Sequence, residues 1–392
     1  MSNQIIVQNV NYGASFDDIR NHFSKAGHVK DVLIALDSNG NSRGIAFVSY
    51  DTNKEAHEAV SMFSNTTFQG RKMYVSINEN YQNTKENEKP PEPKHIHSDH
   101  KHGYRPDKST AEYNISIFQE TAEVIEQGHY NDIEGNYHDI SDKVRSSISE
   151  TVTYPEDFSI EQNLTEKLAL RKSYGQNEKS IIFSRIEVTH ESTFQAALRC
   201  KKDTKEVCLL NFANGFVPGG GVLRGCPAQE ETLCRQSNLY YCIKDQNEMY
   251  DYNKSRNSQY CSHYMIYSPN VVFFRDDDYD FLYPRRVSVI TSPAVNCAKL
   301  DESKLDGVYR CMKNRCRRIL QLGMYTNNRV LILGAFGCGA FNNKPEDISR
   351  IFKELIIDEY YGMFFSKIVF AIKGSSGKSL HNFDVFYRRF KT

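Results

Sequence analysis

Three consecutive glycines, Gly219–Gly221, constrain the fold of this chain more than any other feature of its sequence. They follow the apolar run 207–210, which predicts a short buried strand, and they remove three successive side chains from the loop after it. Glycine adopts positive φ easily and lets a ligand approach the backbone, and the amides of such a loop can face inward as an anion-binding nest. The sequence therefore predicts a backbone anion site at the end of a strand.

Three polar residues, Gln229, Glu230 and Glu231, follow the glycines after an interval of seven residues. The pattern beyond them predicts a helix with Leu233 and Tyr240 on one side, so the two carboxylates stand at its start. Acidic residues are common in the first turn of any helix. Paired carboxylates one short loop from an anion site are nevertheless the groups needed to cleave a glycosidic bond in a phosphorylated sugar. The G-x-G-x-x-G spacing of a dinucleotide-binding loop is absent.

The glycines, the seven-residue interval and the Gln-Glu-Glu triplet, preceded by the Asn-Phe-Ala-Asn of residues 211–214, resemble the signature of poly(ADP-ribose) glycohydrolases. The resemblance is strongest to the compact microbial type, which is built on a macrodomain and needs no metal or other cofactor. It implies that the ligand is ADP-ribose at the end of a polymer or on a modified protein. The site residues that it implies are the catalytic pair Glu231 and Glu230, with Gln229, Asn214, Gly219, Gly220 and Gly221 around the distal ribose and its phosphate.

The same resemblance assigns both acid and base catalysis to Glu231, which must then hold a proton at neutral pH. A helix N-terminus opposes protonation, whereas burial and the neighbouring charge of Glu230 favour it, and the sequence leaves that balance open. Two other functions also stay open. A non-catalytic ADP-ribose reader would share the loops without needing the Gln-Glu-Glu triplet, and a related hydrolase could act on mono-ADP-ribose attached to protein or nucleic acid.

A second glycine-rich loop lies between the apolar strand 330–333 and a helix that begins at Pro345. Backbone amides and a helix N-terminus can hold a diphosphate without a lysine. The loop resembles the second phosphate-binding loop of macrodomains, and Phe341 matches a position that packs on the distal ribose. The residues implied to cradle the diphosphate are Gly334, Ala335, Phe336, Gly337, Cys338, Gly339, Ala340 and Phe341.

Residues 110–392 alternate between strand and helix patterns, which predicts a mixed α/β domain with a three-layer α/β/α core and its site at one end of the sheet. Expected helices are 111–128, 192–200 and 305–320, the last ending before Gly323, with Arg315, Arg317 and Arg318 on its solvated side. Expected strands are 184–188, 265–268, 271–274, 287–291 and 368–372, and 130–140 should form a hairpin.

Two polar features in this region could be mistaken for catalytic groups. His190 lies in Thr189–Thr193, a segment that precedes a helix here as in microbial-type relatives, and we expect a loop or capping residue rather than a base. Asp276–Asp278 could bind a metal ion, but a solvated turn is the simpler interpretation.

Residues 1–80 read as β-α-β-β-α-β, with strands at 5–10, 29–35, 43–50 and 71–77 and helices at 15–23 and 56–63. A turn is expected at 37–40. This order, and the sequences of strands 5–10 and 43–50, resemble the small α+β fold of an RNA-recognition motif with its RNP2 and RNP1 segments. The resemblance implies a partner, single-stranded RNA, bound on the sheet.

In that family three aromatic rings on the two central strands stack on bases. The corresponding residues here are Ile6, Ile45 and Phe47, so a single ring is kept, although Arg43 could bind a phosphate. Residues 1–80 carry seven Lys or Arg against eight Asp or Glu, so charge adds little. Weak RNA binding is expected, with a protein partner as the alternative.

The whole chain of 392 residues has 49 basic and 49 acidic residues and therefore no global field to attract nucleic acid. Residues 81–109 read as a Pro- and charge-rich linker; its four histidines, at positions 95, 97, 100 and 102, could bind a metal but more simply belong to a solvated segment. The ten cysteines include no Cys-x-x-Cys pair, and we expect them to be reduced thiols. The sequence has no apolar run of the length needed to span a membrane. We expect a monomer in the cytoplasm or nucleus.

Overall fold

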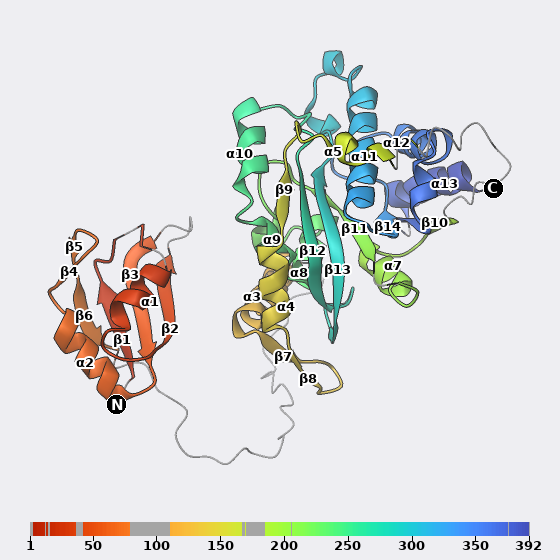
Figure 1. Ribbon diagram of the computed structural model, residues 1–392. Helices are drawn as coiled ribbons and strands as arrows, with labels where there is room; N and C mark the ends of the chain where they lie inside the picture. Colours follow the sequence, from red (N-terminus) through yellow and green to blue (C-terminus); the bar gives the residue numbers. More distant parts are fainter. Residues whose placement is uncertain are drawn as a thin grey trace. The chain divides into compact units, whose positions relative to one another are not determined.

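The computed structural model of the chain describes residues 3–36 apart from Tyr12 and Ser15, and then 42–78, 110–166, 169, 185–204, 206–374 and 376–391. The chain forms two compact units, Met1–Asp99 and His100–Thr392 (Figure 1). The division falls inside the predicted linker 81–109, which lies outside the described residues together with its four histidines. The predicted turn at 37–40 lies outside them as well.

The first unit has a four-stranded antiparallel sheet in the order β2-β3-β1-β6, with two helices against one face. Alternate residues of the strands, among them Ile5 and Val7 of β1, face these helices and are buried. The predicted β-α-β-β-α-β order is confirmed. Its elements are β1 (Gln4–Gln8), α1 (Phe16–Phe23), β2 (Val29–Leu36), β3 (Ser42–Tyr50), α2 (Asn53–Phe63) and β6 (Tyr74–Ile77).

One expectation for this unit was wrong, because the predicted strand 71–77 is divided at Met73. The side chain of Met73 is buried, and its backbone N–H and C=O bond to Thr66 and Asn65 instead of to β1. Before it, β5 (Arg71–Lys72) pairs with β4 (Thr67–Phe68) in a separate two-stranded sheet. The division leaves Tyr74 as the first residue of β6, which pairs with β1.

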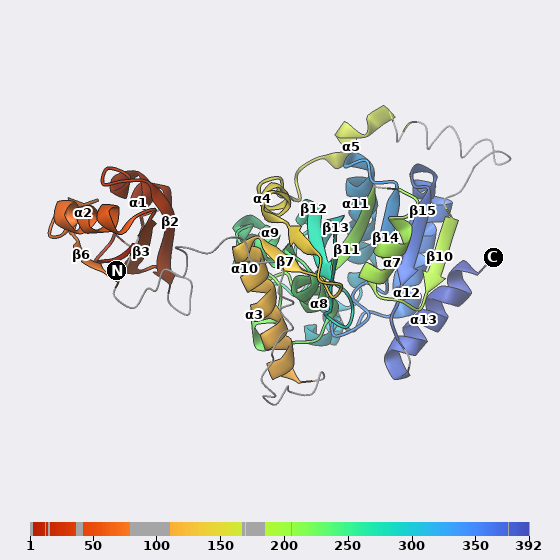
Figure 2. The ribbon, with the colours of Figure 1, turned by 90° about the horizontal axis from the view of Figure 1, so that it is seen from below.

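The second unit is built on a seven-stranded sheet in the order β10-β15-β14-β11-β13-β12-β9 (Figure 2). The five neighbouring strands β10, β15, β14, β11 and β13 are parallel to one another. The next strand, β12, runs antiparallel to β13, and β9 runs antiparallel to β12. The carboxyl ends of the five parallel strands therefore share one edge of the sheet. The strands are β9 (Val152–Tyr154), β10 (Arg185–Thr189), β11 (Val207–Ala213), β12 (Met265–Arg275), β13 (Phe281–Pro293), β14 (Val330–Leu333) and β15 (Lys367–Ala371).

Helices cover both faces of this sheet, which confirms the mixed α/β class. In β11, Cys208 and Leu210 belong to the core cluster that includes residues of α11, α12 and α13, whereas Val207 and Leu209 belong to the cluster on the other face with residues of α7, α8 and α9. The expected hairpin at 130–140 is also present, as β7 (His129–Asn131) and β8 (Tyr137–Asp139). The helices are α3 (Ala111–Gln127), α4 (Ser141–Ser149), α5 (Ile160–Asn163), α7 (Thr193–Cys200), α8 (Gln229–Gln236), α9 (Leu239–Ile243), α10 (Asn247–Arg256), α11 (Val308–Tyr325), α12 (Pro345–Lys353) and α13 (Gly377–Phe390).

Three expectations for this unit need correction. Strands 265–268 and 271–274 are one strand, β12, whose pairing with β13 shifts register between Ser268 and Val271. Gly323 lies inside α11 rather than after it. A Cβ on Gly323 would come within 3.0 Å of the side chain of Leu331. Arg315 is fully buried instead of solvated, because it donates to the carbonyls of Pro293 and Tyr260.

All ten cysteines lie in the described part of the chain and are free thiols, as the sequence predicts. Over the same residues, no helix combines the length and the apolar character needed to cross a membrane.

Candidate active site

The candidate site lies at the carboxyl ends of β11 and β14, which are neighbours in the sheet. The loop after β11 carries the three glycines and leads into α8, and the loop after β14 leads into α12. Because the two strands are parallel, the sheet brings both predicted anion-binding loops to the same edge.

The glycine loop lies directly against the two carboxylates at the start of α8. Gly219 and Gly220 have φ values of 67° and 57°, which only glycine adopts without strain. A Cβ on Gly220 would lie 2.6 Å from Oε1 of Glu231 and 3.0 Å from Oε2 of Glu230. A side chain at position 220 would therefore occupy the space in front of the carboxylates.

Backbone amides from the loop fix both carboxylates. Glu231 is 7% exposed, and its Oε1 accepts the N–H of Gly221 at 2.8 Å. Glu230 is 3% exposed, and its Oε2 accepts the N–H of Asn214 at 2.8 Å, while the amide of Asn211 donates to its Oε1 at 3.2 Å. The two acids thus have defined positions at the end of β11.

Burial raises the pKa of Glu230 to about 8, against hydrogen bonds from Asn214 and Asn211 that favour the charged form. Glu230 is therefore largely protonated at neutral pH. The N-cap residue of α8 is Ala228, so no side-chain cap accepts a hydrogen bond from the first N–H groups of this helix.

Gln229 joins α8 to β11. Its Oε1 accepts the N–H of Phe212 at 2.8 Å, and its Nε2 donates to the carbonyl of Leu210 at 2.8 Å. Asn214 folds the glycine loop in a similar way, because its Oδ1 accepts the N–H of Phe216 at 2.9 Å. Direct contact of either side chain with a ribose stays a prediction.

The second loop presents mainly backbone at the site. Phe336 and Cys338 are fully buried, whereas Gly339 and Ala340 are exposed and Phe341 is partly buried. The remaining two glycines of the loop are tightly packed: a Cβ on Gly334 would lie 2.8 Å from the carbonyl of Ala371, and one on Gly337 would lie 2.6 Å from Asn343. Ala335 is partly buried between them. The N–H groups of Phe336 and Cys338 donate to the carbonyls of Gly334 and Ala335, so backbone contacts with a ligand would come from the other amides of the loop.

The two ambiguous polar features have structural partners. His190 lies in the loop before α7 and stacks on Phe383, with ring centroids 3.3 Å apart, while Ser192 caps the helix. Asp277 is not solvated: it accepts hydrogen bonds from Ser192 and pairs with Lys373 at 2.8 Å. Across the described residues no group of three or more His, Cys, Asp or Glu could hold a metal ion.

In the first unit, the predicted RNA-binding residues share the sheet face that the helices leave open. Ile6 and Phe47 are cross-strand partners, and Ile45 lies opposite Gln8. On its other side Gln8 lies opposite Tyr74 of β6, which is 51% exposed. Tyr74 therefore adds a second ring to the face that carries Phe47. The side chain of Arg43 lies outside the described part.

The family described as "Microbial-type PARG, catalytic domain" matches residues 118–276. A poly(ADP-ribose) glycohydrolase from Thermomonospora curvata is 32% identical, covers 71% of this chain and 100% of its own, and has a TM-score of 0.63. The chain belongs to the microbial-type poly(ADP-ribose) glycohydrolase family. The glycohydrolase from Deinococcus radiodurans, solved in complex with ADP-ribose, is also 32% identical and covers 63% of this chain and 97% of its own, with a TM-score of 0.55.

This glycohydrolase also carries an RNA-recognition motif, which matches residues 5–74. Polyadenylate-binding protein 7 from Arabidopsis thaliana is 37% identical over 73 residues, and the splicing factor SC35 from the same plant is 38% identical over 74. These matches cover only 19% of this chain, and 12% and 24% of those two proteins. They concern the first unit alone.

Sequence reasoning missed two residues that the glycohydrolase places at its candidate sites. Tyr74 falls in a predicted strand, but the sheet face that its side chain occupies depends on the division of that strand at Met73. Lys378 belongs to α13, a helix that was not predicted although Phe383, Phe386 and Phe390 have helical spacing. Its ammonium bonds to the loop after β14.

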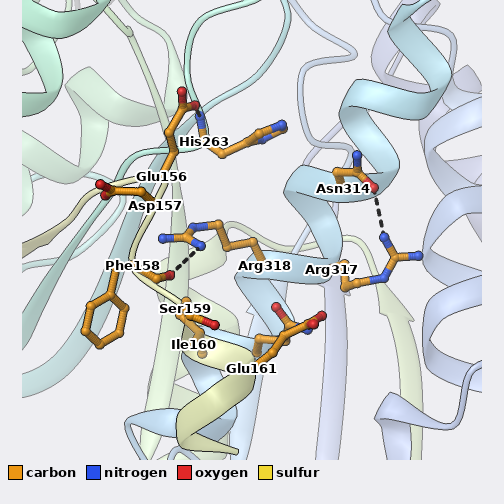
Figure 3. Close-up of a pocket in the computed structure, with 11 residues that line it drawn as sticks. Glu156, Asp157, Phe158, Ser159, Ile160, Glu161, His263, Asn314, Arg317 and Arg318 are labelled. Atoms are coloured by element: carbon orange, nitrogen blue, oxygen red, sulfur yellow. Dashed lines mark hydrogen bonds between the residues drawn. The ribbon is translucent and has the colours of Figure 1, made fainter.

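A polar cavity of about 340 Å³ lies elsewhere in the glycohydrolase domain, between the segment 156–161 and α11 (Figure 3). Arg318 crosses it and donates to the carbonyl of Phe158 at 3.0 Å. Burial lowers the pKa of His263 to about 4, so its imidazole is neutral. No lining residue belongs to the glycine loops or to Gln229–Glu231, which separates this cavity from the candidate active site.

Proposed function

We propose that residues 110–392 hydrolyse the ribose–ribose O-glycosidic bonds of poly(ADP-ribose) and release ADP-ribose, with Glu231 as the general acid and base. The observation that carries this proposal is the position of the carboxylates of Glu230 and Glu231 against the backbone of Gly220. A substrate whose distal ribose lies against the glycine loop would therefore meet both acids.

The reaction requires one proton to pass from the enzyme to the leaving group and one to return to the enzyme from water. Glu231 donates a proton to the ribose hydroxyl oxygen that departs, while the bond between that oxygen and the anomeric carbon of the distal ribose breaks. Water then attacks the oxocarbenium-like carbon, and the carboxylate of Glu231 takes the proton that the water loses. The net change is the addition of one water molecule, and Glu231 returns to its protonated form.

The neighbouring groups hold the substrate. Glu230, protonated at neutral pH, can donate a hydrogen bond to a hydroxyl of the distal ribose without adding a second negative charge. The amides of 334–341 would bind the diphosphate, and the exposed backbone of Gly339 and Ala340 suits that role. The partly buried ring of Phe341 would pack on the distal ribose.

A non-catalytic ADP-ribose reader is the weaker candidate. Binding alone does not require a buried carboxyl held at a raised pKa beside a second acid, and such a pair costs folding free energy. Hydrolysis of mono-ADP-ribose linked to protein or nucleic acid would use the same groups on a different bond.

Product analysis separates these functions. The purified chain should be incubated with poly(ADP-ribose), with a mono-ADP-ribosylated protein and with ADP-ribosylated RNA, and the products identified by mass spectrometry. The proposal expects free ADP-ribose from the polymer. A chain that binds ADP-ribose but releases none from any substrate would be a reader, and release only from the mono-modified substrates would transfer the activity to those bonds.

We also propose that the RNA-recognition motif brings the enzyme to RNA-associated targets through the face that carries Ile6, Ile45 and Phe47. Each stacked base contributes about 1–3 kcal/mol, so Tyr74 would offset part of what the aliphatic residues lack. In a titration of the full chain with single-stranded RNA at low salt, Tyr74→Ala and Phe47→Ala should each weaken binding about 5- to 100-fold. Absence of binding by the unmodified chain would favour a protein partner.

A further inference from the structure

We propose that Lys378 is an additional phosphate-binding residue, through which α13 supplies a side-chain cation to the loop after β14. The inference rests on the proposed function, because that function places the diphosphate of ADP-ribose on this loop. The inference adds to that function that the phosphate site contains a side-chain cation as well as backbone amides, and that α13 supplies this cation.

The ammonium of Lys378 is fixed on the loop itself. Its Nζ donates to the carbonyl of Gly339 at 3.1 Å and to Oδ1 of Asn342 at 2.8 Å. One turn further along α13, His381 lies 3.2 Å from Glu346 in the first turn of α12. The helix α13 therefore contacts both the loop and the start of α12, and the ammonium of the exposed Lys378 is held at the solvent edge of the loop.

The charge of Lys378 is not consumed by a carboxylate. Within the described residues it forms no ion pair, and the carbonyl of Gly339 and the amide oxygen of Asn342 that accept its hydrogen bonds are both neutral. Lys373, five residues earlier, differs because Asp277 neutralises it at 2.8 Å. An ammonium has three donors, so after two neutral acceptors Lys378 retains a donor and a full positive charge for an anion.

The loop beside Lys378 leaves room for a ligand. A Cβ built on Gly339 would meet no atom within 4 Å, whereas those on Gly334 and Gly337 would meet atoms within 3.0 Å. The crowded glycines are thus required by packing, and the open one borders the cation. A phosphate on this open part of the loop would contact amides and the ammonium together, and a diphosphate matches that combination of donors.

The test compares Lys378→Met with Lys391→Met in the full chain. Lys391 follows the last residue of the same helix, its ammonium lies over the ring of Tyr387 at 5.6 Å, and about 20 Å of helix separates it from Lys378. Equilibrium binding of ADP-ribose, ADP and adenosine should be measured at low and high salt, with melting temperatures as a check on folding.

Loss of one charged contact should weaken ADP-ribose and ADP about 5- to 30-fold in Lys378→Met. Adenosine, which has no phosphate, should bind as before, and ADP-ribose binding should become less sensitive to salt. Lys391→Met should match the unmodified chain, and Lys378→Arg should keep most of the affinity.

Three results would overturn the inference. Equal affinity of Lys378→Met and the unmodified chain for ADP-ribose would reject Lys378 while leaving the proposed function intact. An equal loss for adenosine and ADP-ribose would reduce Lys378 to a tie between α13 and the loop. Failure of the unmodified chain to bind ADP-ribose at all would reject both proposals.

Discussion

Replacement of Gly220 by alanine should strongly lower activity with only a moderate loss of stability. Gly220 has a φ of 57°, and a left-handed conformation costs a residue with a Cβ about 1–2 kcal/mol. The added carbon would lie 2.6 Å from Oε1 of Glu231, so the carboxylate must retreat by about 0.8 Å to reach an ordinary van der Waals contact of 3.4 Å. A misplacement that approaches 1 Å at a catalytic group can cost about 10²-fold in rate, and we expect a loss of about 10- to 100-fold in kcat/KM.

Gly135 provides the matched control. It has a φ of 84° in the β7–β8 hairpin, and a Cβ there would meet nothing within 4 Å. Gly135→Ala should therefore have the strain without the displaced carboxylate: similar destabilisation in urea unfolding, but unchanged release of ADP-ribose. If Gly220→Ala were folded and fully active, or if Gly135→Ala lost as much activity, the proposed geometry of the site would be wrong.

Three further predictions concern pH, metal and packing. Because the pKa of Glu230 is raised from 4.5 to about 8, the folded state keeps a proton that the unfolded chain releases between these two pH values. The free energy of unfolding should therefore fall as the pH rises from 5 to 8. Urea midpoints measured over this range should fall less in Glu230→Gln than in the unmodified chain. Hydrolysis should survive EDTA; a loss restored by Mg²⁺ would instead implicate Asp276–Asp278. Arg315→Met should destabilise the glycohydrolase domain by about 1–3 kcal/mol in the same assay, because the buried carbonyl of Pro293 and the part-buried carbonyls of Tyr260 and Cys261 lose their donor; an unchanged midpoint would contradict the role of Arg315.

The parts of the site that follow from local chemistry could be predicted from the sequence. The apolar run 207–210 lies in β11, Gly219 and Gly220 take the left-handed conformation that glycine favours, and Glu230 and Glu231 lie in the first turn of α8 as expected. Each of these outcomes depends on neighbours in the chain. The alternation of strands with helices predicts that both loops lie at one end of the sheet, but not that β11 and β14 are neighbours in it.

The missing parts depend on partners far away in the sequence. Arg315 looks like a solvated residue on its helix, and only the approach of the carbonyls of Pro293 and Tyr260 makes it a buried donor. Gln229 has its amide satisfied by β11, which no local pattern indicates. Lys378 could be connected with Gly339 only once the packing of α13 against the loop was known.

The central claim is that Glu231 transfers the proton, and release of ADP-ribose from poly(ADP-ribose) by Glu231→Gln tests it most directly. Glu112→Gln, an exposed acid in the first turn of α3, is the control. Loss of general acid–base catalysis should lower the rate of Glu231→Gln by at least about 10²–10⁴-fold, while its affinity for ADP-ribose stays close to that of the unmodified chain. Turnover by Glu231→Gln within a few-fold of the control would contradict the claim and direct attention to Glu230.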